Sequence, residues 1–478
     1  MKLLHINFLS FFLLDFASSL DYLVNSRICS SHECKLTSKR ILENLDSSVD
    51  PCDDFYLFSC GGFKFNNKIP EKNDMIESLD LVVKELNMKS KGLLMDDTLL
   101  SHGSKTVRKV KEMYDDCMND DDIHVYSVVE EILVEKLLKL NDQLNTNNIS
   151  STFKQIQGIQ LEATRLRGLL HLKKEDQCDF IFEDKFPYVF DRLFIDKYSV
   201  VEDVDAARHL FDSIKTTIEQ DTEIDWVSQK SLNSIQKGLR RTRYNIGFPD
   251  WILEDDQLDR EYRGGSKHKE WGMNIRQVNA EFRWGFKGIK ADKQEITVPV
   301  GILSRHMFNS NVPSHVNYGA AGFVSGHELS HGVQFWIKRV EKDTVHEKEM
   351  CIQGQLEEVV EPQTGLSYLN ARLVSAEAVA DVAAINASFN SWMKTRDHES
   401  LPGLSAFTPE QLFFISFANI WCFNAKDDRI RKELSTPSDH PFNYHRVIIS
   451  VINSPDFSNA FHCKPTSKMN PLQKCIVW

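Results

Sequence analysis

The sequence predicts a mainly helical α+β protein with a small β-sheet, organised in two domains, three at most. Three observations lead to this fold class. Apolar residues recur at helical spacing over most of the chain, and strand signals appear in a short region after residue 278. The chain has 478 residues, more than one hydrophobic core normally supports. Hydrophobic residues make up 41% of it, which excludes wholesale disorder.

The N-terminus has the pattern of a secretory signal peptide. Lys2 precedes a mostly apolar run at residues 3–14, and small residues follow at 17–19. Polar residues interrupt this run, so it is too short and too polar to span a bilayer, and no other segment approaches 18 consecutive apolar residues. We therefore expect a signal peptide at residues 1–19 and a soluble, secreted protein without a stable membrane span.

The charge and the cysteine content of the chain agree with a secreted protein. The net charge of −12 argues against nucleic acid or anionic membrane as the main partner. Ten cysteines, an even number, favour a disulfide framework, although their spacing alone does not assign partners. Asn148 and Asn386 each begin an Asn-x-Ser motif and are candidate glycosylation acceptors.

The helical periodicity marks core-facing stripes. One stripe consists of Leu210, Phe211, Ile214 and Ile218, and part of another consists of Ile156, Ile159 and Ala163. Residues 120–150 are acidic and rich in asparagine, which is typical of a surface loop around a helix. Residues 253–270 are polar and include two adjacent glycines, so they are predicted to be a connection.

Two strands are predicted upstream of the most informative motif. They cover residues 279–284 and 295–303, and the turn-prone stretch between them predicts a hairpin-like pairing. Pro299 lacks the N–H group that a central strand needs, so we expect the second strand to lie at an edge or to contain a bulge.

The motif GHELSH at residues 326–331 indicates a metal centre. On a helix, His327 and His331 lie one turn apart and face the same way, so both imidazoles can bind one ion. Glu328 lies beside them and can take a proton from water that the metal activates. The neighbouring residues are apolar, and a solvated polar face is not expected inside such a run. The pattern therefore favours a zinc enzyme.

A catalytic zinc ion needs a third protein ligand and one open position. A third histidine six residues after the second is absent, because Ile337 stands there. Glu377 and Asp381 are the best candidates, since they are the only charged residues of SAEAVADVAAI and lie one helical turn apart. A buried carboxylate without a partner costs several kcal/mol. Glu377 would bind the metal, and Asp381 would accept a hydrogen bond from a ligating histidine and fix its tautomer.

Taken together, the motifs resemble the neprilysin and endothelin-converting-enzyme family of zinc metallopeptidases. The resemblance covers nearly the whole chain after the signal segment. It is carried by DSSVDPCDDFYLFSCGGF at 46–63, VNAEF at 278–282, VPVGIL at 298–303, NYGAAGFVSGHELSHG at 317–332, AEAVAD at 376–381, QLFFISFANIWC at 411–422, SDHPFNYHRV at 438–447 and MNPLQKCIVW at 469–478. It implies a reduced helical domain at 52–248 and a thermolysin-like zincin catalytic domain with a small sheet at 270–478, stapled by disulfides.

The resemblance also implies roles for individual residues. It implies one zinc ion per chain, with His327, His331 and Glu377 as ligands and Glu328 as general base. Asp381 would not bind the metal itself but would accept a hydrogen bond from a ligating histidine. It implies that His440 stabilises the oxyanion and that Arg446 binds a substrate carbonyl. Asn279 and Ala280 would hold the substrate main chain, which suits an edge strand, while Phe323, Val324 and Trp421 would line the pocket after the scissile bond. The implied disulfides are Cys29–Cys34, Cys52–Cys463, Cys60–Cys422, Cys117–Cys178 and Cys351–Cys475.

The chain also departs from the family pattern. The helical segment between Cys117 and Cys178 is much shorter, and Met75 stands where neprilysin has an arginine that binds a substrate's C-terminal carboxylate. We therefore predict a secreted zinc metalloendopeptidase that cuts peptides on the amino side of hydrophobic residues. The alternative is a catalytically weak or inactive relative that acts as a secreted peptide-binding protein. The sequence does not specify the oligomeric state.

Overall fold

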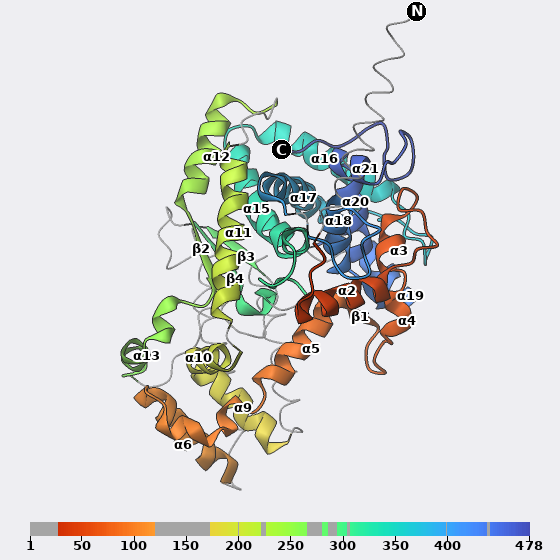
Figure 1. The fold of residues 1–478 in the computed structure, drawn as a ribbon. Coiled ribbons are helices and arrows are strands. Elements are labelled where there is room, and N and C mark those ends of the chain that lie inside the picture. The colour runs from red at the N-terminus through yellow and green to blue at the C-terminus, as the bar shows by residue number, and fades with distance from the viewer. Residues whose placement is uncertain are drawn as a thin grey trace, which may run out of the picture. The chain divides into compact units, whose positions relative to one another are not determined.

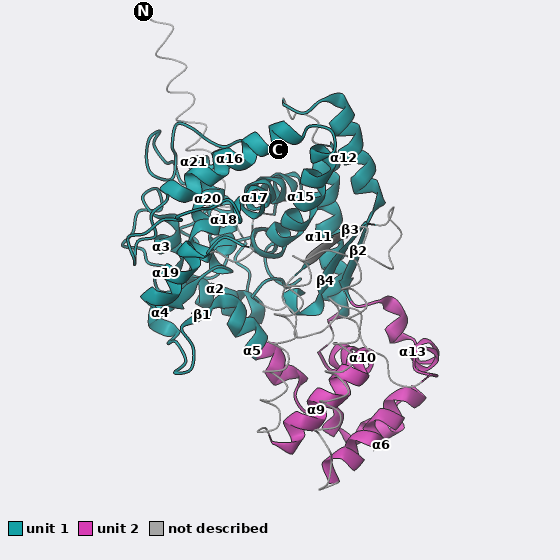
Figure 2. Ribbon diagram, turned by 180° about the vertical axis from the view of Figure 1, so that it is seen from behind, with its two compact units in different colours: residues 1–84, 201–247, 277–478 teal, residues 85–200, 248–276 magenta. Residues whose placement is uncertain are grey.

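The computed structural model describes residues 27–119, 173–198, 200–220, 226–264, 280–284, 294–303, 306–397, 399–436 and 440–478. The chain divides into two compact units (Figure 2). Unit 1 comprises residues 1–84, 201–247 and 277–478, and unit 2 comprises residues 85–200 and 248–276. This division differs from the expected domains at 52–248 and 270–478. Two stretches of the expected N-terminal domain, 52–84 and 201–247, pack with the C-terminal part of the chain.

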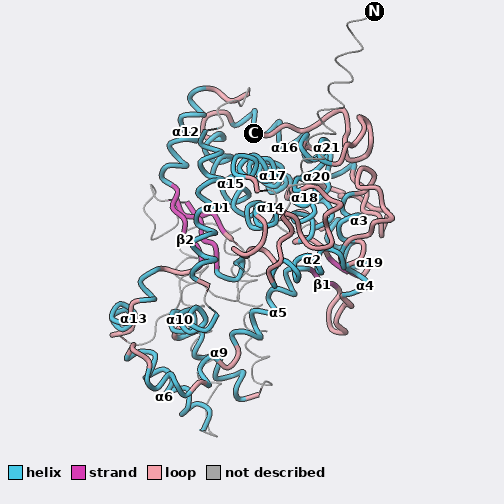
Figure 3. Tube along the Cα trace, in the orientation of Figure 1, coloured by secondary structure: helices cyan, strands magenta, loops and turns pink. Residues whose placement is uncertain are grey.

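Both units are built mainly of helices, with short strands in unit 1 only, as far as the described residues go (Figures 1 and 3). The elements of unit 1 are α2 (His32–Asn44), α3 (Phe55–Cys60), α4 (Phe63–Asn66), β1 (Met75–Glu77), α11 (Val201–Gln220), α12 (Gln229–Arg241), β2 (Thr242–Gly247), β3 (Glu281–Trp284), β4 (Gln294–Pro299), η4 (Val300–Leu303), α14 (Ser314–Asn317), η5 (Tyr318–Gly322), α15 (Phe323–Lys338), α16 (Lys342–Glu358), α17 (Ser375–Thr395), α18 (Pro409–Asn419), β5 (Phe423–Ala425), α19 (Asp427–Ser435), α20 (Asn443–Ile452) and α21 (Pro455–Ala460). The elements of unit 2 are η1 (Leu93–Met95), η2 (Asp97–Ser101), α6 (Lys105–Asn119), α9 (Lys174–Lys185), α10 (Pro187–Tyr198), η3 (Asp250–Leu253) and α13 (Asp255–Glu261), and α5 (Ser78–Ser90) begins in unit 1 and ends in unit 2. The predicted mainly helical fold with a small sheet is confirmed.

Unit 1 contains a two-stranded and a three-stranded sheet. In the larger sheet β3 and β4 pair antiparallel, which confirms the predicted hairpin-like pairing, and β2 pairs with β4 in parallel. Pro299 was expected to place its strand at an edge or to mark a bulge, and the edge position is wrong, because β4 lies between β2 and β3. Pro299 is tolerated because it is the last residue of β4 and the chain turns into η4 directly after it. In this sheet β3 is an edge strand, and Ala280 immediately precedes it.

The predicted helical stripes have different outcomes. The stripe of residues 210–218 lies on α11, where all four of its apolar residues are buried, so that prediction is confirmed. The stripe at 156–163 and the loop expected at 120–150 lie outside the described residues. The segment 253–270, expected to be a connection, contains α13, so the prediction of a plain connection is wrong there.

Close packing of α15 against α17 forms the centre of unit 1 (Figure 1). A Cβ atom at Gly326 would lie 2.9 Å from the carbonyl oxygen of Ala384 and 3.0 Å from its Cα, closer than real Cβ atoms usually approach. Only glycine therefore lets the two helices approach this closely. Gln334 adds a hydrogen bond between the two helices, because its Nε2 donates to the carbonyl of Ala376 at 2.9 Å. The glycine and the amide together fix the height and spacing of the two helices that carry the site.

Five disulfides join the described cysteines, and they are the five pairs that the family resemblance implies. Cys52–Cys463 and Cys60–Cys422 bridge sequence separations of 411 and 362 residues within unit 1. These two bonds attach the N-terminal segment to the C-terminal part of the chain, and described residues include no free cysteine. A framework of this kind is typical of proteins folded in an oxidising compartment.

A buried histidine on α20 makes stability depend on pH. Nε2 of His445 donates to the carbonyl of Val359 at 3.1 Å, and burial lowers the pKa of His445 to about 4 although that hydrogen bond acts in the opposite direction. Its ordinary pKa is about 6.5, so the unfolded chain binds more protons than the folded protein between pH 4 and 6.5. Stability should therefore fall as the pH is lowered, by about 2 kcal/mol between pH 7 and pH 5.

Urea unfolding at pH 7 and pH 5 tests this expectation. His445→Gln keeps a donor for Val359 but cannot titrate, so its stability difference between the two pH values should be smaller than that of the wild type by about 2 kcal/mol. The exposed His346 on α16 offers the matched control, because His346→Gln should leave the wild-type pH dependence in place. Equal pH dependence in the wild type and His445→Gln would show that His445 does not cause it.

Candidate metal centre

Two helices place the predicted ligands around one point. His327 and His331 lie one turn apart on α15, and Glu377 lies in the first turn of α17. Nε2 of His327 lies 3.1 Å from Nε2 of His331. Oε2 of Glu377 lies 3.2 Å from the first of these nitrogens and 3.3 Å from the second. The structure thus brings together the three side chains that the sequence suggested as ligands.

The donor atoms and their spacing fit a zinc ion. Ligands held at ~2.0–2.1 Å in a tetrahedron lie about 3.3–3.4 Å from one another, close to the separations seen here. Oε2 of Glu377 is buried and lacks a hydrogen bond of good geometry in the part of the chain that the structure describes. Two imidazoles and one carboxylate form a known ligand set of catalytic zinc sites. A divalent cation would therefore satisfy donor atoms that otherwise face one another.

Asp381 contacts the imidazole of His327 on the side that faces away from the other ligands. Its Oδ1 lies 2.8 Å from Nδ1 of His327, so Nε2 of that imidazole points toward the ligand cluster. Nε and Nη2 of Arg446 donate to the two oxygens of Asp381 at 2.9 and 2.6 Å. The guanidinium also lies 4.0 Å from the ring centroid of Trp421. The aspartate, the arginine and the tryptophan are all buried, so this group supports the ligands from the protein interior.

The charges of the cluster stabilise one another. Burial disfavours a protonated His327, but the carboxylates of Asp381 and Glu377 raise the pKa of His327 to about 9. Despite burial, the two histidines hold the pKa of Glu377 far below its ordinary range. Burial also opposes ionisation of Asp381, but Arg446 and His327 keep the pKa of Asp381 below its ordinary value. Without metal, His327 therefore carries a proton at neutral pH that a bound cation must displace.

Two further predicted residues lie at the cluster. Glu328 is buried on α15, and no side-chain hydrogen bond or ion pair joins it to the other described residues. His440 precedes α20, its side chain is 54% exposed, and its Nε2 lies 3.3 Å from Oε2 of Glu377. His327, Glu377 and His440 together form a group whose donor atoms could hold a metal ion.

Comparison with known families is consistent with this geometry. A sequence model of peptidase family M13 matches residues 289–477, and a second model of the same family matches residues 51–169. Together the two matches cover more than half of the chain, and the first contains every residue of the cluster. The chain belongs to peptidase family M13. This confirms the resemblance to neprilysin and endothelin-converting enzyme.

Two curated relatives of this chain are named after neprilysin and endothelin-converting enzyme. It is 30% identical over 323 residues to "Neprilysin-2" of Drosophila melanogaster, an alignment that covers 59% of this chain and 41% of the relative. It is 27% identical over 313 residues to "Endothelin-converting enzyme homolog" of Locusta migratoria, covering 57% of this chain and 42% of the relative. The matched part thus spans about two fifths of the length of these relatives.

Solved structures share the fold of this chain over most of its length. A structure titled "Haemonchus galactose containing glycoprotein complex" superposes with a TM-score of 0.68 at 18% identity, covering 95% of this chain and 100% of that one. The zinc metalloprotease ZMP1 of Mycobacterium tuberculosis superposes with a TM-score of 0.58 at 13% identity, covering 88% of this chain and 96% of that one. At these identities the likeness concerns the fold. Among the described residues of the M13 chain, no helix is both long and apolar enough to cross a membrane.

The residues predicted to contact substrate differ in their exposure. Phe323 is 1% exposed and packs against Phe417, with ring centroids 4.6 Å apart, so its ring is part of the buried core. Val324 is half-buried on α15, and Trp421 is 8% exposed beside Phe323. Ala280 immediately precedes the edge strand β3, and Asn279 lies outside the described residues.

Sequence reasoning missed two contacts that position the M13 ligands. One is the double hydrogen bond between Arg446 and Asp381, and the other is the bond from Gln334 to the start of α17, one residue before Glu377. A signal for the first existed, because an arginine within the apolar stretch of α20 needs a buried acid as partner. The second had no local signal, because a single glutamine on a helix has many uses.

The two predicted glycosylation acceptors have different outcomes. Asn148 lies outside the described residues. Asn386 lies within α17, where it is half-buried and its Oδ1 is covered, while Ser388 of the same motif is fully buried. A glycan needs an accessible acceptor, and the Asn-x-Ser motif alone does not show whether its asparagine is exposed. The interior of α17 therefore argues against the prediction at Asn386.

Proposed function

We propose that this M13 chain is a secreted zinc metalloendopeptidase that cleaves peptides on the amino side of hydrophobic residues. The observation that carries the proposal is the convergence of His327, His331 and Glu377 within 3.1–3.3 Å of one another, with Asp381 behind the first histidine. A general base, Glu328, lies on the same helix between the two histidines. Membership of a peptidase family supports this assignment.

Each side chain has a distinct task in this proposal. Zinc, when held by the three ligands, would polarise the scissile carbonyl and acidify a water molecule. Glu328 takes the proton of that water and delivers it to the leaving amine. His440 donates a hydrogen bond to the developing oxyanion, a contribution of about 3–4 kcal/mol in comparable sites. N–H groups of Arg446 not used by Asp381 bind a substrate carbonyl.

Substrate recognition follows from neighbouring elements. The free edge of β3, which begins just after Ala280, would pair with an extended peptide by main-chain hydrogen bonds. Val324 and Trp421 offer apolar surface for the side chain that follows the cut. Met75 lies in β1 and offers no positive charge for a terminal carboxylate, which favours cleavage within a peptide over removal of its end. The five disulfides and the signal-like N-terminus support secretion.

A specific observation favours a second candidate function. His440 approaches Glu377 as closely as the two helical histidines do, so it is a candidate fourth ligand. A zinc site closed by four protein ligands is structural, because no position remains for water or substrate. The chain would then be a peptide-binding relative that does not cleave.

Peptide cleavage with controlled metal content separates the two candidates. The purified protein is incubated with a mixed library of short peptides as isolated, after removal of metal by a chelator, and after return of one equivalent of zinc. The proposal predicts cuts before hydrophobic residues that disappear without metal and return with zinc. Bound zinc at one per chain without any cut would instead support the peptide-binding relative.

A further inference from the structure

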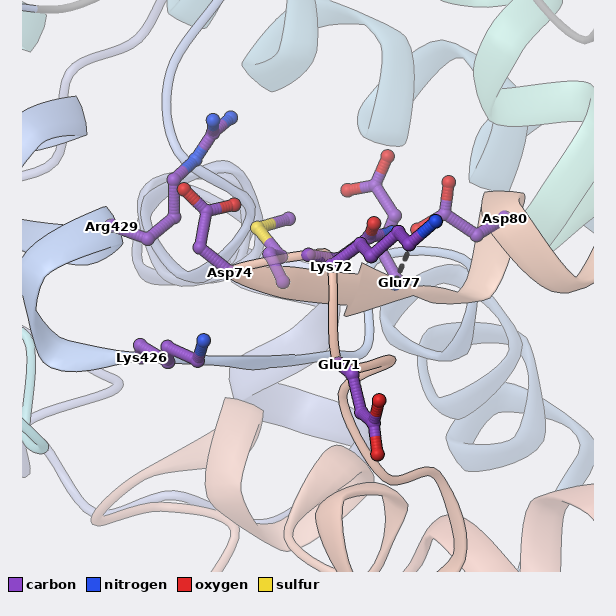
Figure 4. A pocket seen from close by; sticks show the side chains of 9 residues that line it. Glu71, Lys72, Asp74, Glu77, Asp80, Lys426 and Arg429 are labelled. Atoms are coloured by element: carbon purple, nitrogen blue, oxygen red, sulfur yellow. Dashed lines mark hydrogen bonds between the residues drawn. The ribbon is translucent and has the colours of Figure 1, made fainter.

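A second feature of unit 1 is a pocket of ≈ 530 Å³ beside strand β1. Residues of β1, the start of α5 and the start of α19 line it. Figure 4 shows Glu77 and Asp80 toward one end of the pocket and Asp74 and Arg429 toward the other. The pocket is strongly polar and lies outside the metal cluster, and of its lining residues only Met75 has been discussed above.

The Glu77 end of the pocket has unbalanced negative charge. Glu77 is half-buried, and none of the described cations lies within ion-pair distance of it or of Asp80. Arg429, at the other end, is paired with Glu433 at 2.7 Å. The exposed Lys72 lines the pocket but forms no ion pair with either acid in the part of the chain that the structure describes. Burial, and to a smaller extent the charge of Asp80, raises the pKa of Glu77 above its ordinary value, although the hydrogen bond from Asn443 and the charges of Arg429 and Arg446 act in the opposite direction. A cation placed beside Glu77 would stabilise its ionised carboxylate and offset the free-energy cost of burying that charge.

The pocket is linked to the proposed substrate site through α20. Nδ2 of Asn443 donates to Oε2 of Glu77 at 2.9 Å and orients its carboxylate. Asn443 is the first residue of α20, three residues before Arg446 and three after His440. Residues three apart on a helix share a face, and Arg446 is near enough to Glu77 to influence its ionisation. Moreover, β1 pairs with β5, which begins two residues after Trp421.

We propose that the Glu77 end of this pocket is a specificity subsite that receives a lysine or arginine side chain of the peptide substrate. This inference rests on the proposed peptidase function and deepens it. The substrate class is then a peptide that carries a basic residue near the bond to be cut, in addition to the hydrophobic residue after the cut. Asn443 holds the acceptor carboxylate, and Asp80 adds a second negative charge beside it.

Paired peptides test the subsite. They differ at one position, which carries lysine, its neutral analogue norleucine, or glutamate, and the position is moved from three residues before the cut to three after it. For the wild type, kcat/KM at one position should be at least about tenfold higher with lysine than with norleucine, equivalent to about 1.4 kcal/mol. Glu77→Gln should bring this ratio close to one, and Glu77→Lys should favour glutamate over lysine.

A matched control and a binding measurement keep the outcomes distinct. Glu347→Gln removes one exposed acid of α16 outside the pocket and should keep the wild-type ratio. The same lysine-to-norleucine ratio in the wild type and in Glu77→Gln would overturn the subsite, even if cleavage is efficient. If the zinc-loaded wild type cuts no peptide, the proposed activity fails, and the subsite is tested by fluorescence polarisation of the same labelled peptides. Tighter binding of the lysine peptide that is lost in Glu77→Gln would support it, and equal binding would refute it.

Discussion

Replacing Glu328 with glutamine should lower peptide cleavage by ~10²–10⁴-fold while the protein keeps its zinc. The carboxylate of Glu328 is not one of the converging donor atoms, and no side-chain hydrogen bond or ion pair with another described residue would be lost. The substitution preserves shape and removes only the ability to accept a proton. In kinetic terms kcat should fall much more than KM rises, because the proton is transferred in the transition state.

Three measurements on each protein check this expectation: kcat/KM for one cleaved peptide, zinc content, and the urea midpoint. Glu347→Gln, the exposed control on α16, should match the wild type in all three. Full activity in Glu328→Gln would exclude it as the base. Loss of zinc together with activity would mean that Glu328 contributes to the metal centre instead.

The parts of the site that could be predicted from the sequence are those set by local spacing. His327 and His331, like Glu377 and Asp381, are pairs one helical turn apart in apolar surroundings, so a helix alone places each pair on one face. The core stripe of α11 and the pairing of β3 with β4 also depend on short-range patterns, and they were predicted for the same reason. Local periodicity therefore identified which residues act together.

The parts that could not be predicted depend on distant contacts. The parallel pairing of β2 with β4 placed Pro299 in a central strand, and nothing near Pro299 indicates a partner 52 positions away. The bond between Glu77 and Asn443 spans 366 positions, and it depends on the disulfides that attach the N-terminal segment to unit 1. The observed units differ from the expected domains for the same reason, because residues 52–84 and 201–247 join the C-terminal part of the chain through long-range packing, aided for 52–84 by two disulfides.

Removing the carboxylate of Asp381 should have the largest effect on stability. Asp381→Ala leaves Arg446 buried without its bidentate partner, and an uncompensated buried charge costs about 3–5 kcal/mol. It also frees Nδ1 of His327, and loss of such a partner typically weakens metal binding ~10–100-fold. Urea unfolding of the metal-free protein measures the first effect, and a competition titration with a zinc chelator measures the second.

A double substitution separates the buried charge from the cavity that alanine leaves. Asp381→Ala with Arg446→Met removes both charges, so it should be more stable than the sum of the two single substitutions predicts, by about 2–3 kcal/mol. Zinc affinity should not recover, because alanine at position 381 still leaves His327 without its acceptor. Recovery of stability without recovery of zinc affinity would show that Asp381 serves two partners for two reasons: it neutralises Arg446 for the fold and orients His327 for the metal. Strict additivity of the two destabilising effects would instead mean that the ion pair contributes no stability beyond that of its separate side chains. The metal centre would then be held in place by the packing of α15 against α17.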